Sequence, residues 1–167
     1  EDLSKRLLLL TAHSAFFLLR ASVSIPRLTY SLRCAPTWKQ RGLLESYDKA
    51  LKVSLEGILN LELTPDQWAQ SSLPVKLGGL GVRHAMDIAV PCFLASVHRF
   101  RTLVTQLLPR HNVDEDPDVK EAIQLWQTEN GEEQPPSMEL SGHQKSWEGP
   151  QQARTLQRLQ DQATTAQ

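Results

Sequence analysis

Apolar side chains recur at a helical spacing between residues 43 and 60, and this periodicity constrains the fold more than any other feature. Five of them follow one another at intervals of three or four residues: Leu44, Tyr47, Leu51, Leu55 and Ile58. The spacing places them on one face and predicts an amphipathic α-helix packed against a core. The pairs Glu45–Lys49 and Lys52–Glu56 stand four residues apart, as in solvated ion pairs on an outer helix face.

Two stretches near the start of the chain also predict helices. Residues 3–24 are apolar on almost every side, which predicts one helix buried in the core, with His13 as a satisfied core residue. Pro26 is expected to end this helix, and residues 27–35 predict a short second one.

Capping boxes mark two further helix starts. Thr37 with Gln40, and Thr64 with Gln67, have the spacing at which two side chains satisfy exposed amides of a first helical turn. Pro65 suits the first position of the second of these helices.

A long apolar stripe follows and is expected to end at Pro109; it consists of Val90, Phe93, Leu94, Val97, Phe100, Val104 and Leu107. Pro91 lies either in the first turn of this helix or at a kink, and both alternatives stay open. Residues 73–77 alone hint at a strand. The sequence therefore predicts a mainly α-helical bundle.

Charge divides the chain into two parts. Residues 1–111 hold 14 Lys/Arg against 8 Asp/Glu, whereas residues 112–167 hold 4 against 11. A basic first part fits a polyanionic partner, although charge of this size can also serve solubility alone. The second part is acidic and rich in Pro and Gln, which is typical of a partly disordered tail with short helices. We therefore expect a helical domain at 1–111 and an acidic linker at 112–167.

No pattern of residues indicates catalysis or a metal site. Cys34 and Cys92 have no Cys or His partners nearby and are expected to be small buried side chains in a reducing compartment. The histidines lack the spacing of metal ligands, and no nucleophile motif is present. The run at 7–19 is short for a membrane span, so we expect an intracellular protein, in cytoplasm or nucleus, with no membrane partner.

Three glycines at Gly78, Gly79 and Gly81 form the most distinctive short stretch. The pattern lacks the Gly-Lys-Ser/Thr ending of a Walker loop and the third glycine of a dinucleotide fingerprint. Glycines permit positive φ and close backbone approach, which favours a sharp turn between packed helices. Lys76 and Arg83 then stand at the two ends of the turn, either as phosphate contacts or as solvated charges.

Four segments in this order form a recognisable arrangement: "HSAFFLLRASVSIPRLTYSLRCAP", "LLESYDKALKVSLEGILN", "WAQSSLPVKLGGLGVRHAMDIAVPCFLASV" and "QKSWEGP". Across roughly residues 10–150 they resemble the region just after the catalytic palm in reverse transcriptases of non-LTR (LINE-like) retrotransposons. The most specific element is the tryptophan followed by "LPVKLGGLGVRHA" and a helix with "FLAS".

The resemblance implies a thumb-like helical bundle and the start of the following linker. In that family, palm aspartates hold two divalent metal ions, Mg²⁺, and one pair of them lies in a Tyr/Phe-x-Asp-Asp turn. This chain contains no Asp-Asp pair, so the resemblance places the metal ligands upstream of Glu1 and implies no catalytic residue here. The implied partners are the template–primer RNA–DNA hybrid and the upstream palm of the same polyprotein.

The expected function is thus that of a non-catalytic fragment of an RNA-directed DNA polymerase that helps to hold the duplex. Five basic residues are the candidate contacts to the nucleic-acid backbone: Lys39, Arg41, Lys76, Arg83 and Arg99. The alternative is a helical protein-interaction module, or an inactive retrotransposon relic, that does not bind nucleic acid.

Overall fold

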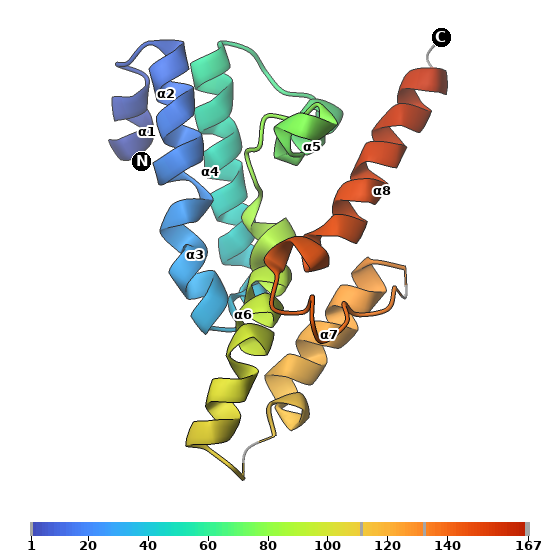
Figure 1. Ribbon diagram of the computed structural model, residues 1–167. Coiled ribbons are helices and arrows are strands. Elements are labelled where there is room, and N and C mark those ends of the chain that lie inside the picture. The colour runs from blue at the N-terminus through green and yellow to red at the C-terminus, as the bar shows by residue number, and fades with distance from the viewer. Residues whose placement is uncertain (1, 111, 132, 166–167) are drawn as a thin grey trace. The chain divides into compact units, whose positions relative to one another are not determined.

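The computed structural model describes residues 2–110, 112–131 and 133–165, which are mainly helical and contain no strand (Figure 1). Its principal helices are α1 (Asp2–Leu7), α2 (Ala12–Leu18), α3 (Ile25–Cys34), α4 (Arg41–Leu59), α5 (Pro65–Ser72), α6 (Ala85–Leu107), α7 (Pro117–Glu129) and α8 (Gln144–Thr165). Single turns complete the order: the π-helix η1 (Leu19–Val23) and the 3₁₀ turns η2 (Thr37–Lys39), η3 (Val75–Leu77) and η4 (Val113–Glu115). The predicted mainly α-helical fold is confirmed.

The described residues form two compact units, each assembled from separate stretches of chain. The first unit takes residues 2–29, 40–86 and 155–165, and the second takes residues 30–39 and 87–154. Residue 111, where the sequence predicts a domain boundary, lies outside the described residues. The division into 1–111 and 112–167 therefore stays a prediction.

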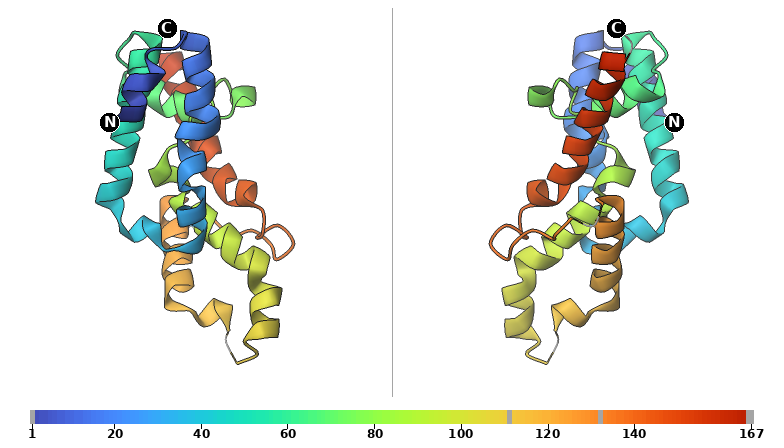
Figure 2. Two further views of the ribbon diagram at one scale, coloured as in Figure 1. Left: turned by 90° about the vertical axis from the view of Figure 1, so that its left-hand side faces the viewer. Right: turned by 90° about the vertical axis from the view of Figure 1, so that its right-hand side faces the viewer.

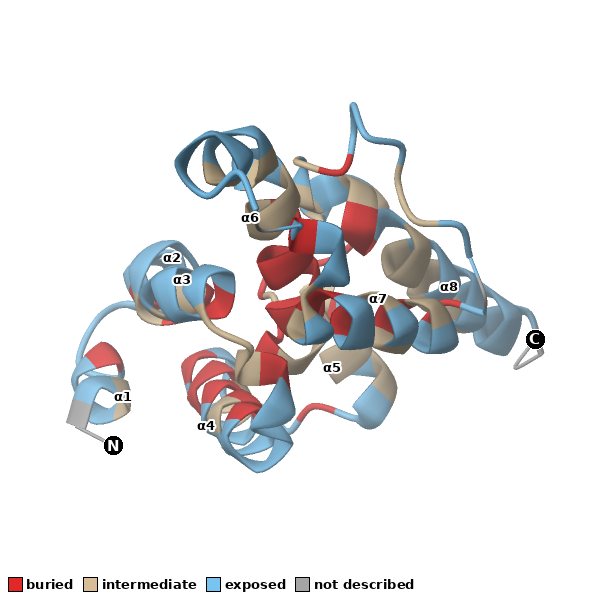
Figure 3. Cartoon of the chain, turned by 90° about the horizontal axis from the view of Figure 1, so that it is seen from below, coloured by how far each residue is buried: buried red, intermediate tan, exposed pale blue. Residues whose placement is uncertain are grey.

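Helix α4 supplies the core of the first unit, as its periodicity predicts. Leu51, Leu55 and Ile58 are buried against Ala15 and Leu19. Figure 3 shows α4 buried along one side and exposed along the other. The outer face carries the predicted Lys52–Glu56 ion pair, with 3.6 Å between Nζ and Oε1. The amphipathic pattern thus identified this helix and its buried face correctly.

The single helix predicted for residues 3–24 is wrong. The chain leaves α1 after Leu7 and restarts at α2, as the separate short helix in Figure 2 shows. Thr11 accounts for the restart, because its Oγ1 accepts a hydrogen bond from the Ser14 amide and caps α2. Leu9 in the intervening loop is 84% exposed, and His13 is exposed as well, not a core residue.

One of the two predicted capping boxes forms. Thr64 and Gln67 exchange both hydrogen bonds at the start of α5, with N···O distances of 3.0 and 3.2 Å. The box at Thr37 is wrong, because residues 37–39 form the 3₁₀ turn η2 and Trp38 is buried. Helix α4 begins after Gln40 without a side-chain cap.

Helix α6 starts at Ala85, earlier than its apolar stripe predicted, which places Pro91 inside the helix. Of that stripe, Phe93 and Leu94 are buried, whereas Phe100 and Leu107 are 51% and 70% exposed. The second half of the stripe therefore does not contribute to a core within the described residues. The strand suggested for residues 73–77 is also wrong, because residues 75–77 form the turn η3.

Tryptophans organise the second unit. The rings of Trp126 in α7 and Trp147 in α8 meet edge to face, with centroids 5.1 Å apart. Nε1 of Trp126 donates to the carbonyl of Trp147 at 2.8 Å, and Nε1 of Trp147 donates to the carbonyl of Ser141 at 2.7 Å. These buried bonds fix the first turn of α8 to α7 and to the segment just before α8.

The last part of α8 packs within the first unit. Leu156, Leu159 and Ala163 face Leu73 and Leu77 across an open groove of about 460 Å³. The apolar side of this part of α8 thus lies against the segment from α5 to η3.

Candidate nucleic-acid interface

The glycine turn after α5 has the geometry that its sequence predicts. Gly78 and Gly81 have φ of +79° and +70°, in the left-handed region that glycine adopts readily. A Cβ at Gly79 would lie 2.1 Å from the carbonyl oxygen of Leu73 and 2.6 Å from that of Gln70. Gly78 and Gly81 thus allow the backbone to turn, and Gly79 allows it to pack directly against the carbonyls of Leu73 and Gln70.

The amides of this turn bond to the chain itself. Successive N–H groups from Leu77 to Val82 all donate to carbonyls within residues 71–75, at 2.8 to 3.3 Å. The Gln70 side chain closes the corner by donating to the carbonyl of Gly78 at 3.0 Å. A phosphate-binding loop needs such amides directed at the ligand. The turn is therefore closed on itself, and a phosphate here can be bound only by side chains.

Cations border the turn within the first unit. Lys76 is exposed on η3, and Arg83 is half-buried just before α6 and has an interaction partner within the protein. Arg20, which is not among the cations predicted from the sequence, comes from η1 and lies beside Gly81: a Cβ at Gly81 would be 3.6 Å from Arg20 Cδ and 3.9 Å from its Nη1. No local signal could have indicated this contact, because it joins segments about sixty residues apart.

Tyr47 in α4 holds the π-helix that carries Arg20. Its hydroxyl donates to the carbonyls of Val23 and Ser24, at 3.0 and 2.8 Å. Burial raises the pKa of this phenol above its ordinary value, and the nearby Arg27 opposes the shift in part. Tyr47 therefore stays neutral and keeps donating at physiological pH. The sequence indicated Tyr47 as an apolar stripe residue and did not reveal this second role.

Asp48 fixes the other end of the turn. Its buried carboxylate accepts hydrogen bonds from the amides of Ala85 and Met86, at 2.6 and 2.9 Å. These are the first amides of α6, so a remote side chain caps the helix and meets the positive end of its dipole. Because Arg83 lies only two residues before Ala85, the same contact limits where Arg83 can lie. The sequence did hold one signal for this contact, since Asp48 is an acidic residue on the buried face of α4.

The remaining predicted cations are distributed over both units. Arg41 is exposed at the start of α4 in the first unit and has an interaction partner within the protein. Lys39 and Arg99 belong to the second unit. Nζ of Lys39 lies 2.7 Å from Asp118 and 2.9 Å from Glu121, whereas Arg99 is an exposed residue of α6. The structure thus brings Lys76 and Arg83 to one turn and shows Lys39 already paired.

The His and Cys residues that the structure describes do not gather into a cluster. In the described ranges, no three His, Cys, Asp or Glu side chains gather as metal ligands. His84 stacks on Trp68 with ring centroids 3.9 Å apart. Cys92 is buried as predicted, but the prediction that Cys34 is buried is wrong, because this residue is exposed at the last position of α3.

None of the helices in the part of the chain that the structure describes combines the length and the apolar character needed to cross a bilayer.

Comparison with known proteins adds no relative. The scan against protein-family models, the search of curated proteins and the search of solved structures all found no match.

Proposed function

We propose that this chain is a non-catalytic, thumb-like helical fragment of an RNA-directed DNA polymerase of the non-LTR retrotransposon type. In this role it helps to hold the template–primer hybrid by its phosphates. The proposal includes an upstream palm that supplies the metal-binding aspartates, and an acidic C-terminal tail that is partly disordered around α7 and α8. It rests on the family resemblance and on one structural observation, the closed glycine turn bordered by cations.

The turn supports a particular kind of binding. Its amides are occupied by the chain's own carbonyls, so the phosphate contacts come from Lys76 and Arg83, with Arg20 beside Gly81. Contacts from side-chain cations to phosphates carry no sequence information, which suits a hybrid held by its shape and backbone. Such binding weakens steeply with salt, because each neutralised phosphate releases counterions.

The test compares the binding of a fluorescent RNA–DNA hybrid at about 50 and about 200 mM salt, the range over which phosphate contacts lose most affinity. The Lys76→Gln/Arg83→Gln variant should bind more weakly, and its slope of log affinity against log salt should be shallower by about two. Lys49→Gln/Lys145→Gln removes the same charge from other exposed positions and serves as the control. Equal slopes for both variants would refute the role of the turn.

A second candidate function is a protein-interaction module. Phe100, Leu103 and Leu107 recur at helical spacing on α6 and are 51%, 48% and 70% exposed, which is unusual for a solvated helix. Failure of the whole chain to bind the hybrid at either salt concentration would favour this function over the first.

A further inference from the structure

Lys39 is held in place by its neighbour in sequence. Trp38 is buried and meets the Phe93 ring edge to face, with centroids 6.4 Å apart. Nζ of Lys39 lies 5.1 Å from the centroid of the Trp38 ring, within the range of a cation–π contact. Because the indole is anchored in the second unit, the ammonium group has a defined position beside it.

Two carboxylates of α7 form ion pairs with this ammonium group. Asp118 and Glu121 stand three residues apart, so they lie on one face of the helix. Their oxygens are 2.7 and 2.9 Å from Nζ of Lys39. Asp116 accepts a hydrogen bond from the Asp118 amide at 2.9 Å, which fixes the start of the helix. The two carboxylates, first Asp118 and then Glu121, raise the pKa of Lys39 above its ordinary value.

The charge balance of this group opposes nucleic-acid binding. One ammonium faces two carboxylates, so Lys39 with the acidic pair, Asp118 and Glu121, has a net charge of −1. A phosphate approaching Lys39 would therefore meet repulsion, although the sequence alone makes this lysine a candidate contact. The side chains are 37%, 41% and 55% exposed, and ion pairs this accessible are weak enough for another anion to compete.

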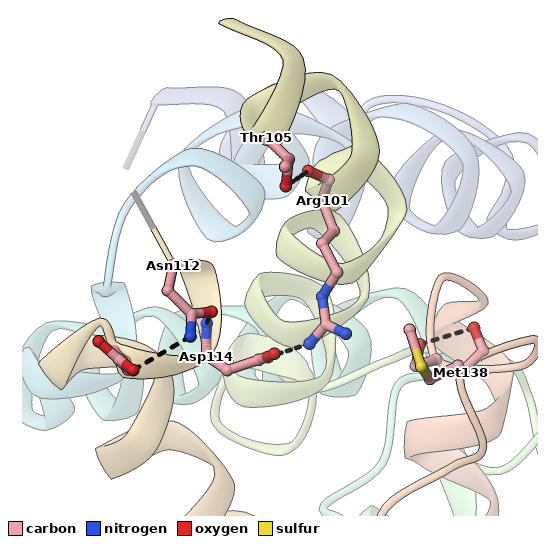
Figure 4. Close-up of polar contacts among 7 residues, drawn as sticks. Arg101, Thr105, Asn112, Asp114 and Met138 are labelled. Atoms are coloured by element: carbon pink, nitrogen blue, oxygen red, sulfur yellow. Dashed lines mark hydrogen bonds and ion pairs between the residues drawn. The ribbon is translucent and has the colours of Figure 1, made fainter. Parts of the chain in front are cut away.

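The same acidic stretch engages a second cation. Arg101 of α6 pairs with Asp114, just before α7, as Figure 4 shows. Asn112 accepts a hydrogen bond from the Asp114 amide at 3.1 Å and shapes the turn that presents this carboxylate. Residues 114–121 thus neutralise basic side chains of their own unit at two separate places.

We propose that Asp118 and Glu121 imitate phosphate within the chain and keep Lys39 from the nucleic acid, so that the chain binds below its full affinity. The acidic pair is then an autoinhibitory contact, and its release adds one phosphate contact. This inference rests on the proposed function, since it assumes binding to a polyanionic duplex.

The experiment measures hybrid binding by the full chain with Asp118→Asn/Glu121→Gln. Affinity should rise, and the salt slope should steepen by about 0.9, so that the gain shrinks about 3.5-fold between about 50 and about 200 mM salt. Lys39→Gln should have little effect alone but should abolish the gain in the double variant. Glu121→Gln alone leaves the start of α7 intact and should give part of the gain if the double variant folds poorly.

Glu133→Gln/Glu139→Gln removes the same two charges from exposed positions of the same unit and is the matched control. An equal gain in this control, or a gain that survives Lys39→Gln, would overturn the inference in favour of bulk charge. No gain in Asp118→Asn/Glu121→Gln, together with weaker binding by Lys76→Gln/Arg83→Gln, would overturn the inference alone. A gain in Asp118→Asn/Glu121→Gln, together with unchanged binding by Lys76→Gln/Arg83→Gln, would overturn the role of the glycine turn. Absence of hybrid binding by the wild type and every variant would overturn both the proposed function and this inference.

Discussion

Replacing Asp48 should destabilise the first unit more than any other single change of a charged residue there. Asp48 is 8% exposed, and its carboxylate accepts hydrogen bonds from the Ala85 amide at 2.6 Å and from the Met86 amide at 2.9 Å. In Asp48→Ala both amides lose their partner. A buried hydrogen bond to a charged group contributes about 1.5–3 kcal/mol, and the partly buried Met86 bond contributes less. The expected loss is about 2–4 kcal/mol.

Asp48→Asn separates the charge from the geometry. The amide oxygen still accepts one hydrogen bond, but the negative charge at the positive end of α6 is gone. The expected loss of unfolding free energy is about 1–2 kcal/mol, between that of wild type and Asp48→Ala. Urea unfolding followed by circular dichroism at 222 nm measures both values, and Asp48→Ala should lower Tm by roughly 6–12 °C.

Glu45→Gln is the control for this series. Glu45 is an exposed acid on the same helix, one turn before Asp48, and its replacement should change stability by less than about 0.5 kcal/mol. If the unfolding free energies of Asp48→Ala and Glu45→Gln differ by less than about 0.5 kcal/mol, the Asp48 carboxylate does not cap α6. The account of how Arg83 is positioned would then be wrong as well.

Three further changes test other parts of the structure. Gly79→Ala should cost more than about 2 kcal/mol in urea unfolding, because its Cβ would overlap the Leu73 carbonyl, and a neutral result would refute the close approach. Burial lowers the pKa of His98, so the folded state favours neutral imidazole and stability should be lost as pH falls below about 6.5. His98→Gln should remove that part of the pH dependence between pH 7.5 and 5.5, whereas an unchanged profile would contradict it. Trp147→Phe should cost about 1–3 kcal/mol by leaving the Ser141 carbonyl without its donor, and unchanged stability would count against this bond.

The parts of the fold that the sequence predicted well depend on local signals. The buried face of α4 follows from spacing within one helix, and the capping box at Thr64 needs only residues three apart. The failures have two different causes. Thr37 has the spacing of a capping residue, but residues 37–39 form a 3₁₀ turn in which the adjacent Trp38 is buried. At Thr11 the missed signal is itself local, because this residue caps a new helix, α2, where the apolar run predicted one continuous helix.

In the candidate site, the sequence predicted what depends on a residue itself and missed what depends on contacts between distant residues. The glycines could be assigned to a turn because their backbone freedom is a property of the residue itself. Whether a cation is available to a ligand depends on what the fold places beside it. Lys39 is paired with carboxylates about eighty residues away, and Arg20 reaches Gly81 from another helix. Neither fact has a trace in the local sequence, so choosing site residues by charge alone could not have found them.

The direction of the amides decides what the glycine turn can do. Phosphate loops and tight turns share a glycine-rich composition, and they differ in whether their N–H groups face a ligand or the chain. From Leu77 to Val82 these groups face carbonyls of residues 71–75. A polyanion at this corner must therefore be held by flexible side chains. Their electrostatic attraction to phosphates is independent of sequence and easily screened by salt. Tight binding of a free nucleotide that persists at high salt would be incompatible with this arrangement, because the amides from Leu77 to Val82 are already bonded to carbonyls of the chain.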